Sequence, residues 1–435
     1  MFQKGLSSIV FLCVVFMNTA WNAAAQTPQE LYTRGMQAVR QGKHQQAIQD
    51  LQRAVTVQPD YAKAHAALGT IYLQLSDFPA AEKALTLALN INPDLLQAEA
   101  NLAVLYTKTK RLDDAIRVYQ NLIRRQPESL QVRLGIASAY QQAERFPEAI
   151  EAYLESLKRS PNLAAAMTNL ASCYEAIEDN AQAIHYYKAA LAVEPNLPMA
   201  NGNLGAIYQE QGELDKALPL LETAIRQNPH FTAARYRLGL VLTKKREFQR
   251  AAAEYQRVIA QQRDHVGAYY NLAQALFRLK KREEGKRAMD AYHRLNEIAQ
   301  EIDTRERATL MEPSNPMQQY RLGLVYAKYG KITEAISAFQ ATLKLDGDAH
   351  YALNALARLY ILQKTQLQDA VSYAKKAFRL SPAPQYLQTL ALVHFQMGAR
   401  ESALKAIHTA IEMEPENEAF QQTLAEIQGL DEKAK

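Results

Sequence analysis

Cysteine is almost absent from this chain of 435 residues, which contains only Cys13 and Cys173. Neither belongs to a C-x-x-C motif, so the sequence offers no thiolate zinc site and no covalent haem attachment. Strand signals are missing as well, because no stretch rich in Val, Ile and Thr alternates with polar residues. The common residues are Ala, Gln, Leu, Glu, Lys and Arg, which all favour helices. We therefore expect an all-α chain.

Catalytic motifs and a strong charge of one sign are also lacking. The 9 histidines form no H-E-x-x-H motif, and no G-x-S-x-G, phosphate-loop or dinucleotide fingerprint occurs. The net charge of +5 is mild for this length, and no basic stripe predicts nucleic-acid binding. Short basic runs at 244–246 and 280–282 fall at expected turns, and we interpret them as solvated turns rather than sites for an acidic ligand. We predict no enzymatic activity, catalytic residue, cofactor or metal.

The first 25 residues have the pattern of a secretory signal peptide. Lys4 precedes an apolar run over 9–17, and the segment ends in small residues with Ala25 at the expected cleavage site. The run is too short to span a bilayer, although an N-terminal membrane anchor is the alternative. We expect export to the periplasm or the cell exterior, with no integral membrane segment after cleavage. Cys173 would then be the remaining thiol, and we expect it to be buried and inert.

A period of 34 residues runs through most of the chain. Three residue types recur at this interval: Pro59, Pro93, Pro127, Pro161, Pro195 and Pro229; Ala47, Ala81, Ala115, Ala149, Ala183, Ala217 and Ala251; Tyr72, Tyr106, Tyr140, Tyr174 and Tyr208. A fixed period of this length is typical of a repeat array, in which one unit cannot bury its own apolar face and neighbours must stack.

One unit, residues 198–231, shows how the period predicts two helices. Pro198 suits the first turn of the first helix, and Gly212 ends that helix. The expected contact faces carry Leu204, Gly205 and Tyr208 on the first helix and Ala217, Leu221 and Ala224 on the second. Small residues at Gly205 and Ala217 predict close packing of the two helices, and Pro229 closes the unit.

These residues resemble the tetratricopeptide repeat. The first helices contain "ALGTIY", "NLAVLY", "GIASAY", "NLASCY" and "NLGAIY". The resemblance implies a right-handed superhelical α-solenoid of about eleven helix-turn-helix units with a C-terminal capping helix. It also implies a protein-binding scaffold that carries out no chemistry of its own. The period predicts eight units over 28–287, an irregular helical linker over 288–315, three units over 316–416 and the cap over 417–430. The linker is either one long helix or two staggered ones.

In this family the first helices line the concave face, where ligands bind. Position six of the unit, which points inward, is Asn in four units: Asn101, Asn169, Asn203 and Asn271. Such a row resembles the asparagine ladder in the repeat domain of the O-linked sugar transferases, and side-chain amides can grip an extended peptide backbone. Gly135 and Arg237 interrupt the ladder. The alternative is that Asn at this position has only a structural role.

Two further interpretations concern the same face. Aromatic and basic residues gather at inward positions of units seven to nine: Tyr236, Arg237, Lys244, Tyr270, Phe277, Arg278, Tyr320 and Arg321. Such residues anchor interfaces and would favour an acidic or aromatic partner, unless they pack on neighbouring helices. A clamp for a C-terminal carboxylate is a weaker match, because its inward Lys and second Asn are missing.

The sequence therefore predicts a non-catalytic scaffold that binds extended segments of partner proteins or peptides in its concave groove. Two alternatives stay open: a component of an envelope machine for polysaccharide export, pilus or outer-membrane assembly, and an accessory subunit of an enzyme on another chain.

Overall fold

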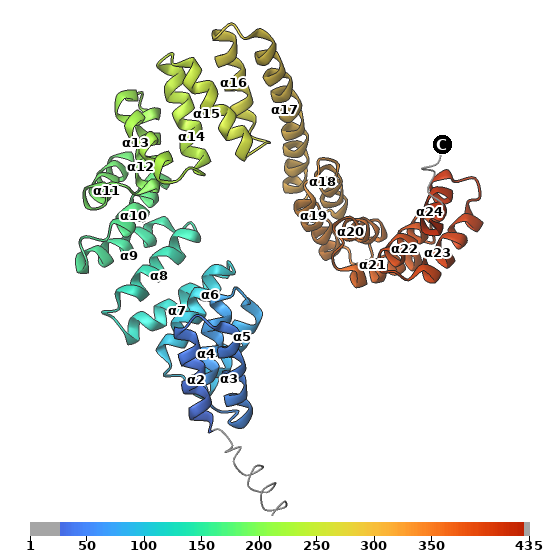
Figure 1. Cartoon of the computed structure of the whole chain (residues 1–435), viewed down its shortest axis with the longest axis horizontal. Helices are drawn as coiled ribbons and strands as arrows, with labels where there is room; N and C mark the ends of the chain where they lie inside the picture. The colour runs from blue at the N-terminus through green and yellow to red at the C-terminus, as the bar shows by residue number, and fades with distance from the viewer. Residues whose placement is uncertain (1–26, 430–435) are drawn as a thin grey trace, which may run out of the picture. The chain divides into compact units, whose positions relative to one another are not determined.

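The structure is a computed structural model that describes residues 27–429, so the expected signal peptide lies outside the described residues. All secondary structure in the described range is helical, and no strand occurs there. This confirms the all-α prediction. The chain divides into two compact units between Arg263 and Asp264, and each is described by itself (Figure 1).

The first unit consists of seven helical hairpins in chain order. Its helices are α2 (Pro28–Arg40), α3 (His44–Val57), α4 (Ala62–Gln74), α5 (Phe78–Ile91), α6 (Leu96–Lys108), α7 (Leu112–Arg125), α8 (Leu130–Gln142), α9 (Phe146–Arg159), α10 (Ala164–Ala176), α11 (Asn180–Val193), α12 (Pro198–Glu210), α13 (Leu214–Gln227), α14 (Thr232–Lys244) and α15 (Phe248–Gln261). Each even-numbered helix is the first helix of a repeat and packs on the odd-numbered helix that follows it.

The two helices of a hairpin approach closely because small residues lie between them. A Cβ atom on Gly205 of α12 would lie 2.8 Å from Cγ of Leu221 and 3.4 Å from the backbone oxygen of Ala217 on α13. The predicted contact of Gly205 and Ala217 is therefore confirmed. Leu221 and Ala217 are fully buried, so this contact forms the centre of the hairpin core.

The turn between the two helices of a repeat contains one residue in the left-handed region. Gly212 has φ +78°, which glycine adopts readily. Other repeats place a residue with a side chain at the equivalent position: Ser76, Lys110, Glu144, Glu178, Arg246 and Lys280, with φ between 57° and 63°. Arg246 and Lys280 belong to the two basic runs, so each run lies at a turn, as predicted, while Lys244 ends α14 and Arg282 begins α17.

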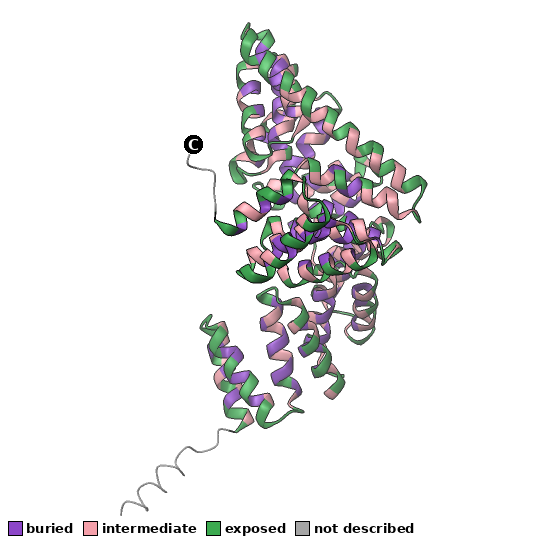
Figure 2. Cartoon of the chain, turned by 90° about the vertical axis from the view of Figure 1, so that its right-hand side faces the viewer, coloured by how far each residue is buried: buried purple, intermediate pink, exposed green. Residues whose placement is uncertain are grey.

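First helices of successive repeats contact one another directly, as α4 does with α6 and α12 with α14. Within the described residues no comparable contact joins two second helices. The first helices are therefore the more closely spaced layer, and they form the inner side of the stack. Buried residues lie where helices face each other, while exposed residues occupy the outer sides and turns (Figure 2).

The second unit contains four more hairpins and a terminal helix. Its helices are α16 (Val266–Arg278), α17 (Arg282–Met311), α18 (Pro316–Lys328), α19 (Ile332–Leu345), α20 (His350–Gln363), α21 (Leu367–Leu380), α22 (Pro384–Gln396), α23 (Arg400–Met413) and α24 (Glu418–Gln428). Together the two units hold eleven helix pairs, as the fold prediction requires. The division between Arg263 and Asp264 precedes the expected linker at 288–315.

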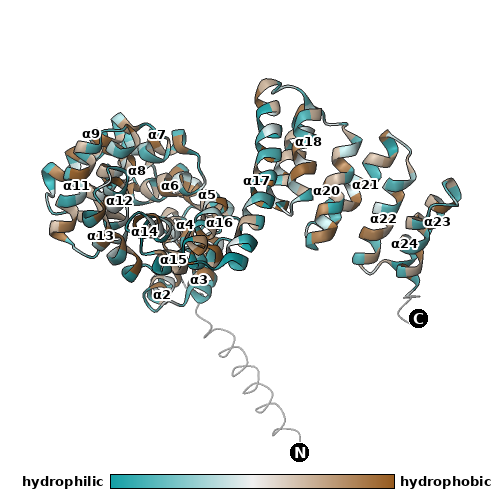
Figure 3. Cartoon of the chain, turned by 90° about the horizontal axis from the view of Figure 1, so that it is seen from above, coloured by the Kyte–Doolittle hydropathy of each residue, from teal (hydrophilic) through white to brown (hydrophobic). Residues whose placement is uncertain are grey.

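The segment expected as one long helix or two staggered ones is one long helix. α17 runs for 30 residues, and only Gly285 and Ala288 of these are buried. Much of the helix is hydrophilic (Figure 3). It packs on α16 and also contacts α18. Glu301 of α17 pairs with Lys328 at 2.9 Å and accepts a hydrogen bond from the Tyr329 hydroxyl. α17 is thus the second helix of one repeat and a packing partner of the next.

The C-terminal helix α24 closes the second unit as predicted. Phe420, Thr423 and Ile427 are buried on α22 and α23. The side chain of Asn417 caps the helix by accepting from the backbone N–H of Ala419. The remaining residues of α24 are mostly exposed, which is the arrangement that the end of a repeat array needs.

Candidate functional site

The asparagine ladder lies on the first helices of the repeats, and its best-defined member is Asn203 on α12. Its Nδ2 donates to the Tyr187 hydroxyl of α11 at 2.9 Å, and that hydroxyl donates to Oε2 of Glu175 on α10 at 2.7 Å. The tyrosine ring is fully buried. This chain of hydrogen bonds joins the first helix of one repeat to both helices of the preceding repeat.

Asn169 repeats the arrangement one unit earlier. Its side chain is exposed and lies close enough to the Tyr153 hydroxyl to act on the pKa of that group, and the hydroxyl donates to Oε1 of Gln141 at 2.9 Å. Burial raises the pKa of Tyr153 and keeps the phenol neutral. In two successive repeats a buried second-helix tyrosine therefore donates to an acceptor near the end of the first helix and has a ladder asparagine beside its hydroxyl.

The other ladder residues have different surroundings. Asn101 on α6 donates from Nδ2 to Oγ1 of Thr70 at 2.8 Å, and its Oδ1 accepts from Nε2 of Gln97 at 3.2 Å. Asn271 lies half-buried on α16, in the second unit. The structure therefore places the three first-unit asparagines at the contact with the preceding repeat.

The interruptions of the ladder have steric and chemical causes. At Gly135 a Cβ atom would lie 2.6 Å from the ring of Tyr119, so the tyrosine of the preceding repeat occupies the space. At Arg237 the preceding repeat has Leu221 in place of tyrosine, so no phenol hydroxyl is present there for an asparagine to contact. Nη1 of Arg237 donates to Oε1 of Gln209 at 2.8 Å and pairs with Glu210 at 2.7 Å.

The predicted aromatic and basic residues belong to two units. Tyr236, Arg237 and Lys244 lie on α14, whereas Tyr270, Phe277 and Arg278 lie on α16. The ring of Tyr236 is 5.9 Å from that of Tyr255, and the Arg237 charge is paired with Glu210. These two residues therefore take part in packing and pairing, while the Lys244 side chain is exposed.

The α16 residues lie against their own hairpin. Tyr270 is 42% exposed and lies 5.2 Å from the ring of Tyr292. The ring of Phe277 covers Gly285, where a Cβ atom would lie 2.6 Å from Cε1. Arg278 is exposed. Part of this aromatic set therefore contributes to packing against α17.

Sequence reasoning missed the residues that hold the ladder. They are the second-helix tyrosines Tyr153 and Tyr187 and the acceptors Gln141 and Glu175. The tyrosines occur 34 residues apart, and this spacing was the available signal. Burial raises the pKa of Glu175 above its usual range, and the nearby carboxylate of Glu210 acts in the same direction. The ladder face therefore includes a half-buried acid.

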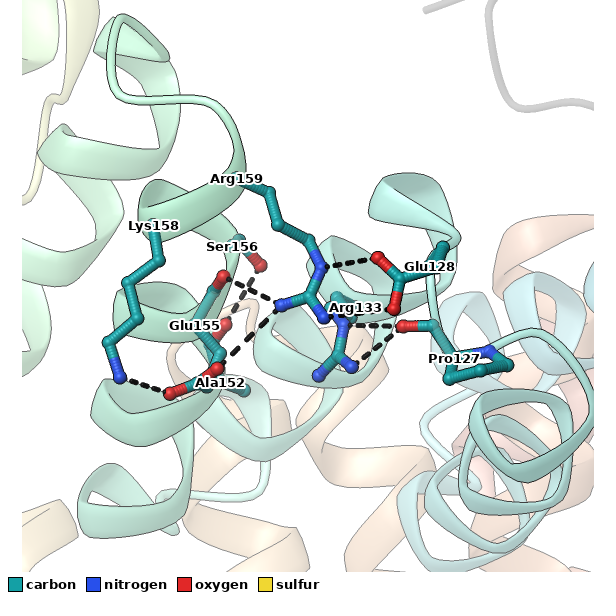
Figure 4. A network of polar contacts seen from close by, with 8 residues as sticks. All are labelled: Pro127, Glu128, Arg133, Ala152, Glu155, Ser156, Lys158 and Arg159. Carbon is teal, nitrogen blue, oxygen red and sulfur yellow. Dashed lines mark hydrogen bonds and ion pairs between the residues drawn. The ribbon is translucent and has the colours of Figure 1, made fainter.

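The second helices present a different surface, where the polar groups are largely paired with each other. Figure 4 shows Arg159 contacting Glu128 and Glu155, which also pairs with Lys158 at 2.5 Å. Beside them, Arg133 of the first helix α8 donates to the backbone oxygen of Pro127. A shallow depression of about 510 Å³ lies nearby between α7, α8 and α9.

The described residues contain no group of three or more His, Cys, Asp or Glu side chains placed to hold a metal ion. Over the same range, no helix combines the length and apolar character needed to cross a membrane. Cys173 is buried, as predicted, and burial raises its pKa to about 11.

Comparison with solved structures finds several repeat proteins. MamA is 24% identical over 39% of this chain and 93% of its own, with a TM-score of 0.36. YrrB, described as a TPR protein with an unusual peptide-binding site, is 17% identical over 55% of this chain and 96% of its own, with a TM-score of 0.33. Yeast Tom70 is 14% identical over 92% of this chain and 95% of its own, with a TM-score of 0.30.

None of the curated proteins compared with this chain matches it. The family model described as tetratricopeptide repeat matches well over half of the chain, at residues 32–95, 101–164, 134–198, 168–229, 203–257, 236–292 and 320–383. These matches fall on the helical hairpins of both units, where the 34-residue period places small residues between paired helices. The chain belongs to the tetratricopeptide-repeat family.

Proposed function

We propose that this chain is a protein-interaction scaffold that binds extended segments of partner proteins on the first-helix face of its first unit. The observation that carries the proposal is the state of the Asn203 amide, which lies on that face and donates one hydrogen bond to Tyr187. A side-chain amide has two donors and two acceptor lone pairs. The bond to the tyrosine fixes the orientation of the amide and leaves capacity for a ligand.

The exposure of Asn169 supports an extended ligand. This residue is one repeat before Asn203 and lies near the equivalent tyrosine, so two amides follow each other along the face. A peptide in an extended conformation presents backbone donors and acceptors at regular intervals, and such groups suit side-chain amides. A compact partner would present few backbone groups to this row.

The N-terminal leader supports a location outside the cytoplasm. The apolar run at 9–17 and the small residues before Ala25 fit a cleaved signal peptide. We place the scaffold in the periplasm or at the cell exterior. N-terminal sequencing of the protein from an envelope or culture fraction tests this location, and a first residue other than Gln26 argues against the cleavage site.

The ladder is tested by two matched double variants. Asn169→Ala with Asn203→Ala removes the amides, whereas Tyr153→Phe with Tyr187→Phe removes the same bonds between repeats but keeps the amides. Crosslinking and mass spectrometry in cells would record partner peptides on α10 and α12. We expect these crosslinks to disappear in the asparagine variant and to persist in the tyrosine variant.

Two outcomes contradict the proposal. Crosslinks that survive the asparagine substitutions show that the amides do not hold the ligand. Equal loss in both variants shows that the asparagines act only through repeat packing. Circular dichroism at 222 nm should show an unchanged helix content in each variant. A pull-down from an envelope fraction then separates a scaffold with many partners from a machine component or an enzyme accessory with one.

A further inference from the structure

The second unit has an inner face whose chemistry differs from that of the asparagine ladder. The face is formed by the first helices α18 and α20. Its inward positions carry Tyr320, Arg321 and Leu324 on α18 and Tyr351, Arg358 and Leu362 on α20. We call these six residues the arginine–leucine face. Leu324 and Arg358 occupy the same position of successive repeats.

Aromatic contacts show that the two helices bring these residues together. The rings of Tyr320 and Tyr351 meet edge to face, with centroids 4.6 Å apart and planes at 66°. Burial raises the pKa of Tyr320 most strongly, while the positive charge of Arg358 lies near enough to act in the opposite direction. The tyrosine pair and Arg358 therefore belong to one continuous surface.

The two arginines provide positive charge that is not neutralised by a salt bridge. Both side chains are exposed, and within the described residues no carboxylate oxygen lies within 4.0 Å of either guanidinium. Hydrogen bonds from Gln318 and Asn315 lower the pKa of Glu312 most strongly, and the charge of Arg321 has a smaller effect in the same direction. In contrast, Lys328 on the same helix is paired with Glu301.

Exposed leucines accompany the arginines. Leu324 is 44% exposed and Leu362 is 67% exposed, although both lie on first helices where apolar side chains usually pack on neighbours. Aliphatic surface beside unpaired guanidinium groups suits a ligand that supplies carboxylates and apolar side chains together. A nucleic acid would use the charges and the tyrosines but would leave the leucines in water.

We propose that the arginine–leucine face is a second protein-binding site, selective for acidic segments that contain aliphatic side chains. The carboxylates of the partner would pair with Arg321 and Arg358, and its apolar side chains would cover Leu324 and Leu362. This site is independent of the ladder, which holds a backbone through amides. One chain could then bind two different segments.

The test measures fluorescence anisotropy of labelled peptides with the whole chain lacking its leader. The main probe is a dodecapeptide of alternating Asp-Asp and Leu-Leu pairs. One comparison peptide replaces each Leu with Ser, another replaces each Asp with Lys, and a twenty-nucleotide oligothymidylate represents nucleic acid. We expect the acidic leucine peptide to bind most tightly, with an affinity that falls as salt is raised because exposed charges are screened.

Arg321→Glu with Arg358→Glu should weaken binding of this probe by roughly tenfold or more, as expected for reversal of two exposed charges. The matched control is Lys375→Glu with Arg379→Glu on the second helix α21, which changes net charge equally and should leave affinity unchanged. Leu324→Ser with Leu362→Ser should also weaken binding. Asn203→Ala should not affect it, so failure of the ladder and failure of this site are distinguishable.

Three results overturn the proposal. The first is no binding of the acidic leucine peptide by the native chain. The second is an equal loss of binding in the α21 control, which would indicate attraction by net charge alone. The third is tighter binding of the oligothymidylate than of the peptide, if this binding disappears when both arginines are substituted. That result would assign the face to nucleic acid. Circular dichroism at 222 nm confirms the fold of each variant.

Discussion

Gly135 interrupts the asparagine ladder, and substituting it tests why. If glycine is there by chance, Gly135→Asn would restore the row between Asn101 and Asn169. The structure predicts destabilisation instead. The equivalent rings of Tyr153 and Tyr187 leave room for Asn169 and Asn203, whereas the Tyr119 ring lies where a Cβ atom on Gly135 would be 2.6 Å from two ring carbons and 2.8 Å from the hydroxyl. Tyr119 is only 4% exposed, so the ring has little room to move away.

The expected cost follows from the size of this overlap. Forcing an extra group into a packed core typically costs about 1–3 kcal/mol, so Gly135→Asn and Gly135→Ala should both lower the free energy of unfolding by about that much. Urea unfolding followed by circular dichroism measures the loss, and hydrogen exchange should locate it in α7 and α8. Shortening Tyr119 to Ala should make the Gly135→Ala substitution nearly neutral in a double-mutant cycle. A Gly135→Ala variant within about 0.5 kcal/mol of the native chain would refute the steric reasoning.

Three further predictions concern groups that the structure describes. Glu175→Gln should stabilise the chain at neutral pH, because the raised pKa of Glu175 means that ionisation is less favourable in the folded state. A glutamine can accept the tyrosine hydrogen bond, as Gln141 does one repeat earlier. The native Glu175 carboxyl contributes its full stability below its ordinary pKa of 4.5, and this contribution is lost as the pH rises through its raised pKa in the folded state. The gain in melting temperature from Glu175→Gln should therefore vanish towards acid pH. Cys173, with its pKa raised to about 11, should react with a maleimide at least about a hundredfold more slowly than free cysteine until the chain is unfolded. Glu178→Gly should raise the free energy of unfolding by up to about 1 kcal/mol, because Glu178 has φ +62°. A higher urea midpoint would show this gain.

The sequence was sufficient for the repeat architecture because the period records packing directly. Small residues such as Gly205 and Ala217 recur where two helices must approach, and the prolines at the ends of repeats mark where helices stop. Each of these features depends on a residue and its neighbours within one hairpin. The helix pairs, the turn at Gly212 and the capping helix α24 therefore follow from local pattern alone.

The chemistry of the ladder could not be obtained in the same way. The period places Asn203 on the inner face, but the role of its amide depends on Tyr187 and Glu175, which belong to the preceding repeat. Arg237 shows the same limit. Its inward position predicts a charge available to a partner, yet Arg237 pairs with Glu210 across the contact between repeats. Contacts of this kind depend on the length and rotamer of two side chains from different repeats.

Ligand binding and repeat packing should be linked if the ladder holds a peptide. The Asn203 amide donates to Tyr187, and Tyr187 donates to Glu175, so a ligand on the amide would extend a chain of hydrogen bonds that already joins two repeats. Bonds in such a chain strengthen one another. A bound partner segment should therefore slow amide exchange in α11, which does not contact the ligand.

Tyr187→Phe separates this linkage from binding itself. The variant keeps the amide on the inner face but breaks the chain at its centre. We expect the partner segment still to bind to the variant and to protect α12, while the protection of α11 is lost. If α11 is protected equally in the native chain and in the variant, the ligand acts on the whole stack by mass action, and the hydrogen bonds do not transmit its effect.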